Sequence, residues 1–119
     1  MIVFKTFRFE AAHYLPLVPL DHPCARMHGH SYTVTVECEG SVREDGMVID
    51  FAEISNVVRP LVATLDHQML NEVIDNPTAE NIAQWFADQL NCVLPLRSIR
   101  VQETETSGAL WLPPARQED

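Results

Sequence analysis

Three of the five histidines are spaced so that they could share one metal ion. His28 and His30 are separated by one residue, and on a β-strand such residues point to the same side. His13 ends an earlier stretch of alternating apolar residues, so a neighbouring strand can bring it to the pair. Three imidazoles leave a fourth metal position for water or substrate, as in catalytic zinc sites. The spacing therefore predicts a zinc centre made by His13, His28 and His30.

Cys24 lies four residues before His28, in a segment that contains three prolines. We therefore expect an irregular loop over 14–27. The cysteine fits three interpretations. It is a fourth zinc ligand that closes the site, a nucleophile or proton-transfer group whose thiol pKa is lowered by the nearby cation, or an ordinary loop residue. The residues alone leave these three open.

Asp66 and His67 form a second candidate pair. A carboxylate can orient an imidazole and stabilise its charged form during proton transfer. Adjacent residues on a helix do not face each other, so this pair needs a helix end or a loop to act together. The alternative is a surface pair at the C-terminus of a helix.

Glu103 falls on the apolar side of a predicted strand, where a carboxylate requires a partner. That partner is either a set of N–H donors on a bound heterocycle or the neighbouring Arg100. Glu105 has the same parity, so the sequence alone does not rank the two glutamates.

The elements that position these residues follow from hydrophobic periodicity. Alternation with a period of two predicts strands over 2–12, 28–39, 98–105 and 109–112, and 47–49 is a shorter candidate. The long hydrophobic strands carry the histidines, so the metal centre is expected where the first two strands meet.

Two helices are predicted between the second and third long strands. The first begins after the N-cap Asp50 and contains Pro60, which should kink or shorten it. The second begins after the N-cap Thr78 and ends at Pro95. The order strand, strand, helix, helix, strand, strand predicts an α+β fold in which an antiparallel sheet carries two helices on one face.

The bulk composition narrows the class of protein. The chain has 119 residues, so we expect a single domain over 1–119. A formal net charge of −9 argues against a general nucleic-acid or anionic-membrane binder. Three widely spaced cysteines do not suggest a disulfide framework, and no apolar run reaches membrane-spanning length. We therefore expect a soluble, cytoplasmic protein with neither nucleic acid nor membrane as partner.

Six segments in order along the chain carry a resemblance to a known family: FRFEAAH (7–13), CARMHGHSY (24–32), MVIDF (47–51), LDHQMLN (65–71), NPTAEN (76–81) and VQET (101–104). The sequence resembles the 6-pyruvoyl-tetrahydropterin synthase superfamily, and most closely its bacterial 6-carboxy-5,6,7,8-tetrahydropterin synthase branch. The match spans nearly the whole chain. One departure is Ala25, where the family usually has glycine, a residue that adopts positive φ readily.

The resemblance implies a fold and an activity. The fold is the tunnelling fold (T-fold), a four-stranded antiparallel sheet with two helices on one face, assembled as trimers that pair into a homohexamer with active sites between subunits. The activity is a zinc-dependent lyase reaction that converts 7,8-dihydroneopterin triphosphate to 6-carboxy-5,6,7,8-tetrahydropterin and releases acetaldehyde and triphosphate, in queuosine-type deazapurine biosynthesis. Relatives with the same site instead make a 6-pyruvoyl or a 6-hydroxymethyl pterin.

The resemblance also assigns roles to residues. It matches the zinc ligands with the three histidines already singled out. It gives proton transfer to three residues: Cys24 as the catalytic cysteine, with the pair Asp66 and His67. It gives substrate binding to three others: Glu103 for the pterin ring, Thr104 beside it and Arg26 for the triphosphate. The alternative of a different class is a non-catalytic, zinc-stabilised binding module in which Cys24 completes a closed site.

Overall fold

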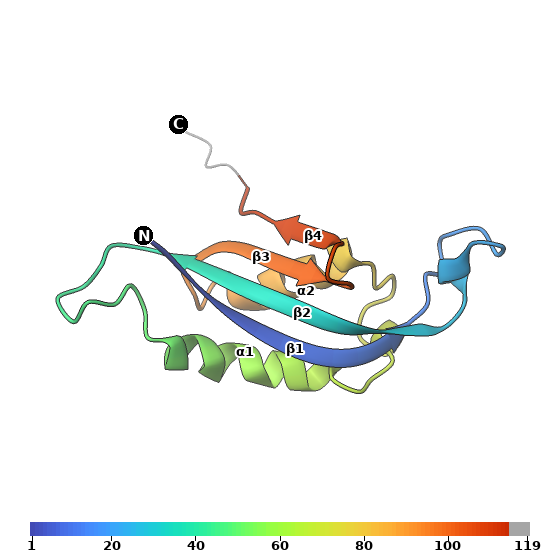
Figure 1. Ribbon diagram of the computed structural model, residues 1–119, viewed down its shortest axis with the longest axis horizontal. Helices are drawn as coiled ribbons and strands as arrows, with labels where there is room; N and C mark the ends of the chain where they lie inside the picture. Colours follow the sequence, from blue (N-terminus) through green and yellow to red (C-terminus); the bar gives the residue numbers. More distant parts are fainter. Residues whose placement is uncertain (115–119) are drawn as a thin grey trace.

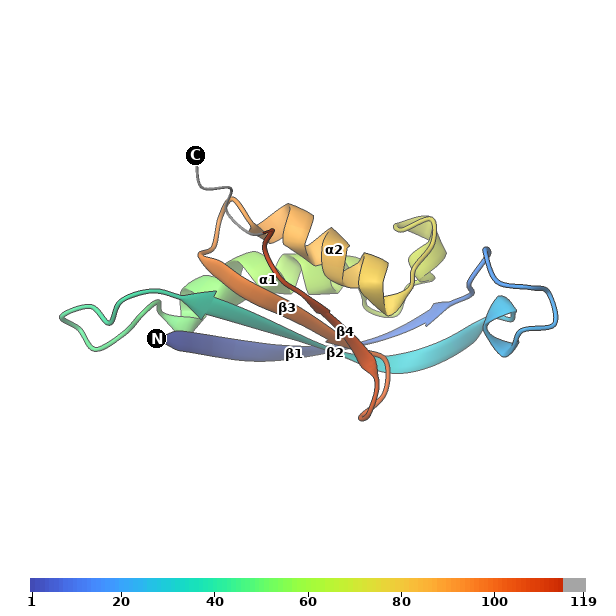
Figure 2. The same ribbon diagram turned by 90° about the horizontal axis from the view of Figure 1, so that it is seen from above.

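The computed structural model describes residues 1–114, and the last five residues of the predicted domain lie outside this range. Within it, four antiparallel strands form a sheet of order β1-β2-β3-β4 (Figure 1). Both helices cover the same face of this sheet (Figure 2). The elements in chain order are β1 (Ile2–His13), η1 (Pro23–Ala25), β2 (His28–Glu39), α1 (Phe51–Leu65), η2 (Leu70–Glu72), α2 (Ala79–Leu90), β3 (Leu96–Gln102) and β4 (Gly108–Trp111). The predicted fold class and element order are confirmed.

The long hairpin of β1 and β2 decides where the histidines lie. The two strands pair along their whole length, from Ile2 opposite Glu39 to His13 opposite His28. Side chains alternate between the two faces of the sheet. The face under the helices is apolar over most of its length: Phe7, Phe9, Ala11, Tyr32, Val34, Val36 and Cys38 are buried there. The three candidate histidines continue this face at the far end of the hairpin.

Each helix begins directly after the residue predicted to cap it. Asp50 accepts a hydrogen bond from the Ala52 N–H at 2.8 Å, and Thr78 accepts one from the Asn81 N–H at 3.1 Å. Such caps stabilise a helix by about 1 kcal/mol each. Helix α1 lies against β1, whereas α2 lies against β3 and β4 (Figure 2). Their buried residues complete the core between helices and sheet: Ile54, Val58, Leu65, Ile82, Phe86 and Leu90. Neither helix is long and apolar enough to cross a bilayer, and the same holds throughout residues 1–114.

Two predictions about the helices need correction. Pro60 does not shorten α1, which continues for five residues beyond it to Leu65. Pro60 is exposed, and so is Asn56, whose carbonyl loses its helical hydrogen bond there. Helix α2 ends at Leu90 rather than at Pro95, because the Leu90 carbonyl accepts N–H groups from the following turn.

The strand predictions differ from the structure at two places. Residues 47–49 are not a strand but part of the loop between β2 and α1, where Gly46 turns the chain with φ of 86°. The strand predicted over 98–105 is β3, which begins at Leu96 and ends at Gln102. The residues that follow form a tight turn, which carries Glu103.

The burial of Cys38 gives a first testable prediction. Cys38 lies in the core under the helices, and burial raises the pKa of its thiol to about 11. Cys92 is exposed and Cys24 is half-buried. At pH 8 we expect two thiols per chain to react with a chromogenic disulfide reagent and the third to react only on unfolding. If all three thiols react equally fast in the native protein, the end of the hairpin where Cys38 pairs with Val3 must open.

Candidate metal centre and active site

The three predicted ligands meet where β1 ends and β2 begins. His13 is 1% exposed, while His28 and His30 are half-buried. One ligand atom of each ring lies within 4.8 Å of the others. The antiparallel register explains this meeting, because it places His13 opposite His28 and Ala11 opposite His30.

Backbone carbonyls fix two of the rings. Nδ1 of His13 lies 2.7 Å from the Pro77 carbonyl oxygen, and Nδ1 of His28 lies 2.7 Å from the Arg26 carbonyl oxygen. Because a carbonyl only accepts, each Nδ1 carries a proton and donates it. In the neutral rings Nε2 is then left with a free lone pair. Metal-binding histidines are usually held in this way, with the second ring nitrogen donating to an oxygen.

The free lone pairs converge. Nε2 of His13 and Nε2 of His28 are 2.9 Å apart, and in neutral rings neither has a proton to share. Burial lowers the pKa of His13 and of His30, which favours their neutral forms. Nε2 of His30 is buried and has no hydrogen-bond partner in residues 1–114. Converging, unpaired lone pairs are unfavourable unless a cation lies between them, so these residues fit a divalent metal.

The carbonyl that holds His13 is itself positioned by the segment before α2. The Thr78 N–H and the Asn81 side-chain amide both donate to the Asn76 carbonyl, at 2.9 and 2.8 Å. The Thr78 hydroxyl oxygen in turn accepts the Asn81 backbone N–H. Buried Pro77 lies inside this closed turn, which directs its carbonyl at the ring of His13.

Replacing Asn81 with alanine should weaken metal binding about tenfold. The variant loses the hydrogen bond to the Asn76 carbonyl, so the Pro77 carbonyl holds His13 less firmly, while the Thr78 cap of α2 remains. Competition with a chromogenic chelator measures the affinity.

The matched control is Gln84→Ala, on the next turn of the same helix. Gln84 is exposed, and its side chain donates to Asp88 rather than to the segment before the helix. Equal metal affinities for the Asn81 and Gln84 variants would show that the Asn81 hydrogen bond does not help the Pro77 carbonyl to hold His13.

Asp66 and His67 follow α1 directly and are fixed to the edge of β1. Oδ1 of Asp66 accepts the Glu10 backbone N–H at 2.9 Å, and the His67 N–H donates to the Glu10 carbonyl. His67 has φ of 58°, the one positive φ of a non-glycine residue in the described chain. This left-handed turn allows both residues to reach the same position of the strand. The pair thus lies at a helix end, as its joint action requires.

Asp66 also orients the His67 ring. Oδ1 of Asp66 lies 3.0 Å from Nδ1 of His67. The hydrogen bonds from the Glu10 N–H and from His67 lower the pKa of Asp66, which favours the carboxylate. With Nδ1 engaged, Nε2 of the exposed imidazole is available to accept or donate a proton.

The turn between β3 and β4 carries Glu103. The N–H groups of Glu103 and Thr104 donate to the Ser107 carbonyl at 3.1 and 3.4 Å, and the Thr104 and Ser107 hydroxyls share a hydrogen bond of 2.6 Å. The strand after the turn must start with glycine, because a Cβ on Gly108 would lie 2.1 Å from the Val101 carbonyl oxygen. The predicted substrate residue Thr104 therefore also closes the turn.

The Glu103 carboxylate points towards the histidine cluster. Its Oε2 lies 3.9 Å from Nε2 of His30, and in the described chain it has no ion pair with Arg100. Glu105 is exposed on the same turn. The structure thus distinguishes the two glutamates that the sequence left unranked, since Glu103 is the one beside the histidines.

Cys24 lies in η1, outside the histidine cluster. In residues 1–114, the group of His, Cys and acidic side chains close enough to share a metal contains the three histidines alone. A closed site with Cys24 as fourth ligand is therefore not formed. Ala25 keeps a negative φ, so the absence of the usual glycine causes no backbone strain in this loop.

Arg26 has an exposed side chain, and its backbone has a clear role. Its carbonyl fixes His28, and its N–H closes η1 by donating to the Pro23 carbonyl at 3.2 Å. A role of the guanidinium towards an anion remains a prediction.

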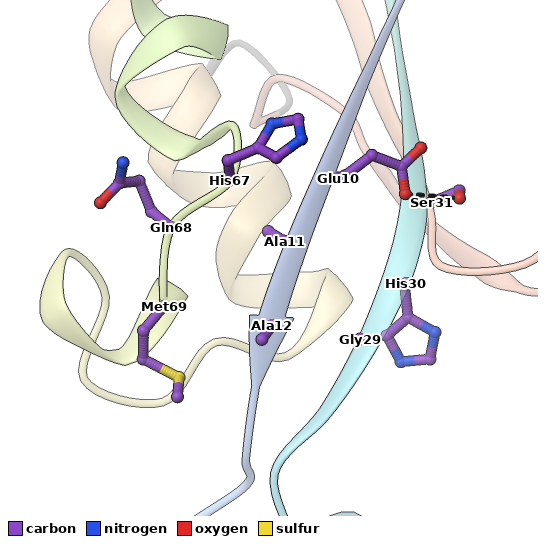
Figure 3. Close-up of a pocket in the computed structure, with 9 residues that line it drawn as sticks. All are labelled: Glu10, Ala11, Ala12, Gly29, His30, Ser31, His67, Gln68 and Met69. Atoms are coloured by element: carbon purple, nitrogen blue, oxygen red, sulfur yellow. Dashed lines mark hydrogen bonds between the residues drawn. The ribbon is translucent and has the colours of Figure 1, made fainter.

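An open pocket of about 550 Å³ adjoins the cluster. Its lining includes His30 from β2, Glu10 from β1 and His67 from the segment after α1 (Figure 3). Figure 3 shows His67 beside β1 and His30 on the other side of that strand. The pocket therefore connects the histidine cluster, through His30, with His67 of the second pair, whereas Cys24 does not line it.

A four-stranded antiparallel sheet with two helices on one face and a three-histidine cluster at its end defines a T-fold protein with a candidate metal centre. The chain belongs to the 6-pyruvoyl tetrahydropterin synthase family, whose model matches residues 2–112.

Known proteins resemble it in sequence and in structure. The 6-carboxy-5,6,7,8-tetrahydropterin synthase of Synechocystis is 40% identical, over 95% of this chain and 94% of that protein. The dihydroneopterin monophosphate aldolase of Pyrococcus furiosus is 38% identical, over 73% of this chain and 72% of that protein. The structure of 6-pyruvoyl tetrahydropterin synthase from Caenorhabditis elegans superposes with a TM-score of 0.85, covers 95% of both chains and is 24% identical, so it bears on the fold.

Sequence reasoning missed the residues that fix the site through their backbone. The Pro77 and Arg26 carbonyls and the Glu10 backbone have no side-chain signature for these roles. The available signal is the segment NPTAEN, whose pattern predicts the helix cap at Thr78 but not the anchoring of a histidine.

Proposed function

We propose that the protein converts 7,8-dihydroneopterin triphosphate and water to 6-carboxy-5,6,7,8-tetrahydropterin, acetaldehyde and triphosphate. The observation that carries this proposal is the convergence of three imidazoles beside Glu103 and an open pocket, on the fold of a pterin synthase family. The Synechocystis relative of that name supports the carboxylated product. The enzyme is then a lyase that acts in the cytoplasm, and its product serves the synthesis of deazapurines such as queuosine.

Zn²⁺ is the metal that best suits a site of three neutral imidazoles. Bound there, it supplies Lewis-acid polarisation that lowers the pKa of a hydroxyl on the substrate side chain. His13, His28 and His30 would hold the ion, and the carbonyls that bind Nδ1 of the first two leave their Nε2 lone pairs free to do so.

Glu103 and its neighbours position the substrate. The carboxylate accepts N–H groups of the amino-pyrimidinone edge of the pterin, and Thr104 lies beside it on the same turn. Arg26, exposed in the loop before β2, pairs with the triphosphate. Held at both ends, the substrate places its side-chain carbons at the histidine cluster.

Cys24 and the Asp66–His67 pair move the protons. Nε2 of His67 and the Cys24 thiol each accept or donate a proton at the substrate side chain, while Asp66 stabilises the charged ring of His67. The ring gains two electrons at the expense of the side chain, a carbon–carbon bond breaks, and the carboxylate takes its second oxygen from water.

Product analysis tests the proposal. Zinc-loaded protein is incubated with 7,8-dihydroneopterin triphosphate, and the expected products are acetaldehyde and 6-carboxy-tetrahydropterin in equal amounts. Protein stripped of metal is the control and should form neither. A 6-pyruvoyl product without acetaldehyde would contradict the carbon–carbon cleavage, and no turnover by zinc-loaded protein would contradict the enzymatic proposal in favour of a binding module.

The Pyrococcus relative favours one second candidate, side-chain cleavage of dihydroneopterin monophosphate to a 6-hydroxymethyl pterin. The same incubation with the monophosphate separates the two candidates. A hydroxymethyl product from the monophosphate, with no carboxylated product from the triphosphate, would establish this second activity instead.

We also infer a homohexamer of paired trimers, with each site completed between subunits. Exposed apolar side chains support an assembly: Leu17 and Leu20, in the loop that carries Cys24, are 80% and 95% exposed, and Phe4 on the edge strand β1 is 60% exposed. Light scattering should give the mass of six chains, and a monomeric mass at micromolar concentration would contradict the assembly.

A further inference from the structure

His22 is not part of the histidine cluster, but its ring caps the turn that carries Cys24. Nδ1 of His22 accepts the Cys24 backbone N–H at 3.0 Å. Pro23 has no N–H, and the N–H groups of Ala25 and Arg26 are taken by the His22 and Pro23 carbonyls. The Cys24 N–H is thus the donor of η1 that lacks a backbone partner, and the His22 ring supplies one.

The hydrogen bond fixes which nitrogen of His22 is protonated. Since the Cys24 N–H donates to Nδ1, this nitrogen has a lone pair, and the proton of the neutral ring lies on Nε2. His13 and His28 have the opposite arrangement, with Nδ1 donating to a carbonyl. His13 and His28 thus leave Nε2 free to bind a metal, whereas His22 uses Nδ1 to accept from the backbone.

The capped turn connects Cys24 to the metal centre. On one side the Cys24 carbonyl accepts the Leu15 N–H at 2.8 Å. Two residues further on, the Arg26 carbonyl holds Nδ1 of His28. The position of η1 thus sets the direction of the Cys24 side chain relative to a metal ligand four residues away.

We propose that His22 is a positioning residue that aims the Cys24 thiol at the substrate by capping η1. The inference rests on the proposed function, in which Cys24 transfers a proton. Within one chain the loop around the turn is rich in proline and exposes Leu17 and Leu20, so the packing of a single subunit does not define it. A displacement of about 1 Å in a catalytic group lowers the rate by roughly 100-fold. His22 is exposed, and its removal leaves the core intact.

Two substitutions separate the cap from the imidazole itself. His22→Ala removes the acceptor. His22→Asn keeps an acceptor oxygen bonded to Cγ, where Nδ1 stands in histidine, and asparagine is a strong capping residue. We expect His22→Ala to lower kcat roughly 10- to 100-fold with KM and bound zinc unchanged, and His22→Asn to restore most of kcat.

A second measurement does not require turnover. In a Cys92→Ser background, where Cys38 stays buried, the rate of alkylation by iodoacetamide reports on Cys24. This rate should change at least about threefold in His22→Ala and return towards the starting value in His22→Asn, whatever reaction the enzyme catalyses. The alkylation result therefore tests the cap even if the proposed pterin reaction is wrong.

Three results would overturn the proposal. Unchanged kcat and alkylation rate in His22→Ala would show that the cap does not position Cys24. A defect in His22→Asn as large as in His22→Ala would show that the ring itself is needed. Loss of zinc from His22→Ala would show that the turn acts through His28 rather than through the thiol.

Discussion

The Cys24→Ala variant is expected to lose about 10²- to 10⁴-fold in kcat and to keep its metal, because a positioned proton-transfer group contributes about that much. Cys24 lies outside the histidine cluster, and its contacts to His22 and Leu15 are made by its backbone, so alanine preserves the loop. Steady-state kinetics and metal analysis of the same preparation measure the two quantities together.

Cys92 provides the control for the loss of a thiol. It is exposed just after α2, and Cys92→Ala should keep both activity and metal. If Cys24→Ala instead loses its metal, the thiol is a ligand in the assembled protein, and the site is the closed, structural type. Full activity in Cys24→Ala would remove the cysteine from the mechanism and leave proton transfer to Asp66 and His67.

The fold was predictable from sequence because its signals are local. The alternation of apolar residues over 28–39 reflects a strand with one buried face, and its bounds agree with β2. Asp50 and Thr78 mark both helix starts, because a side-chain cap acts within three residues. The corrections at Pro60 and at the end of α2 have a different origin: the exposure of Pro60 depends on how α1 packs, and the turn after Leu90 is made by backbone groups that any residue supplies.

The site was predictable only in part, because its members meet through tertiary structure. The pairing of His13 with His28 follows from a hairpin register that alternation could suggest. The anchoring of His13 by the Pro77 carbonyl links residues 64 positions apart through a backbone atom, for which no residue type is required. The same holds for Glu10, whose N–H and carbonyl fix Asp66 and His67. A residue pattern cannot reveal such contacts, because any side chain at these positions supplies the same backbone groups.

The His30→Ala variant should bind zinc at least about 100-fold more weakly. Removing a hydrogen-bond partner of a metal ligand already lowers metal affinity about 10- to 100-fold, and removing the ligand itself should lower it further. Alanine is tolerated at this position of the hairpin, because the residue opposite is Ala11 and His30 is only half-buried. Isothermal titration of the metal-free protein with zinc measures the affinity. His67→Ala is the matched control: it removes an exposed imidazole from the same pocket and should keep the metal while lowering activity.

Thermal stability with and without metal distinguishes a binding site from a structural contact. In the metal-free protein Nε2 of His30 is buried without a hydrogen-bond partner, so its removal should not lower the melting temperature. With zinc at about 1,000 times the Kd of the unsubstituted protein, that protein should gain about 4 kcal/mol. The variant, which binds at least about 100-fold more weakly, should gain no more than about 1.4 kcal/mol. The unsubstituted protein should therefore melt at a higher temperature than the variant only when zinc is present. If His30→Ala is the less stable protein by the same margin in both conditions, the ring stabilises the hairpin, and three converging imidazoles are a feature of packing rather than of metal binding.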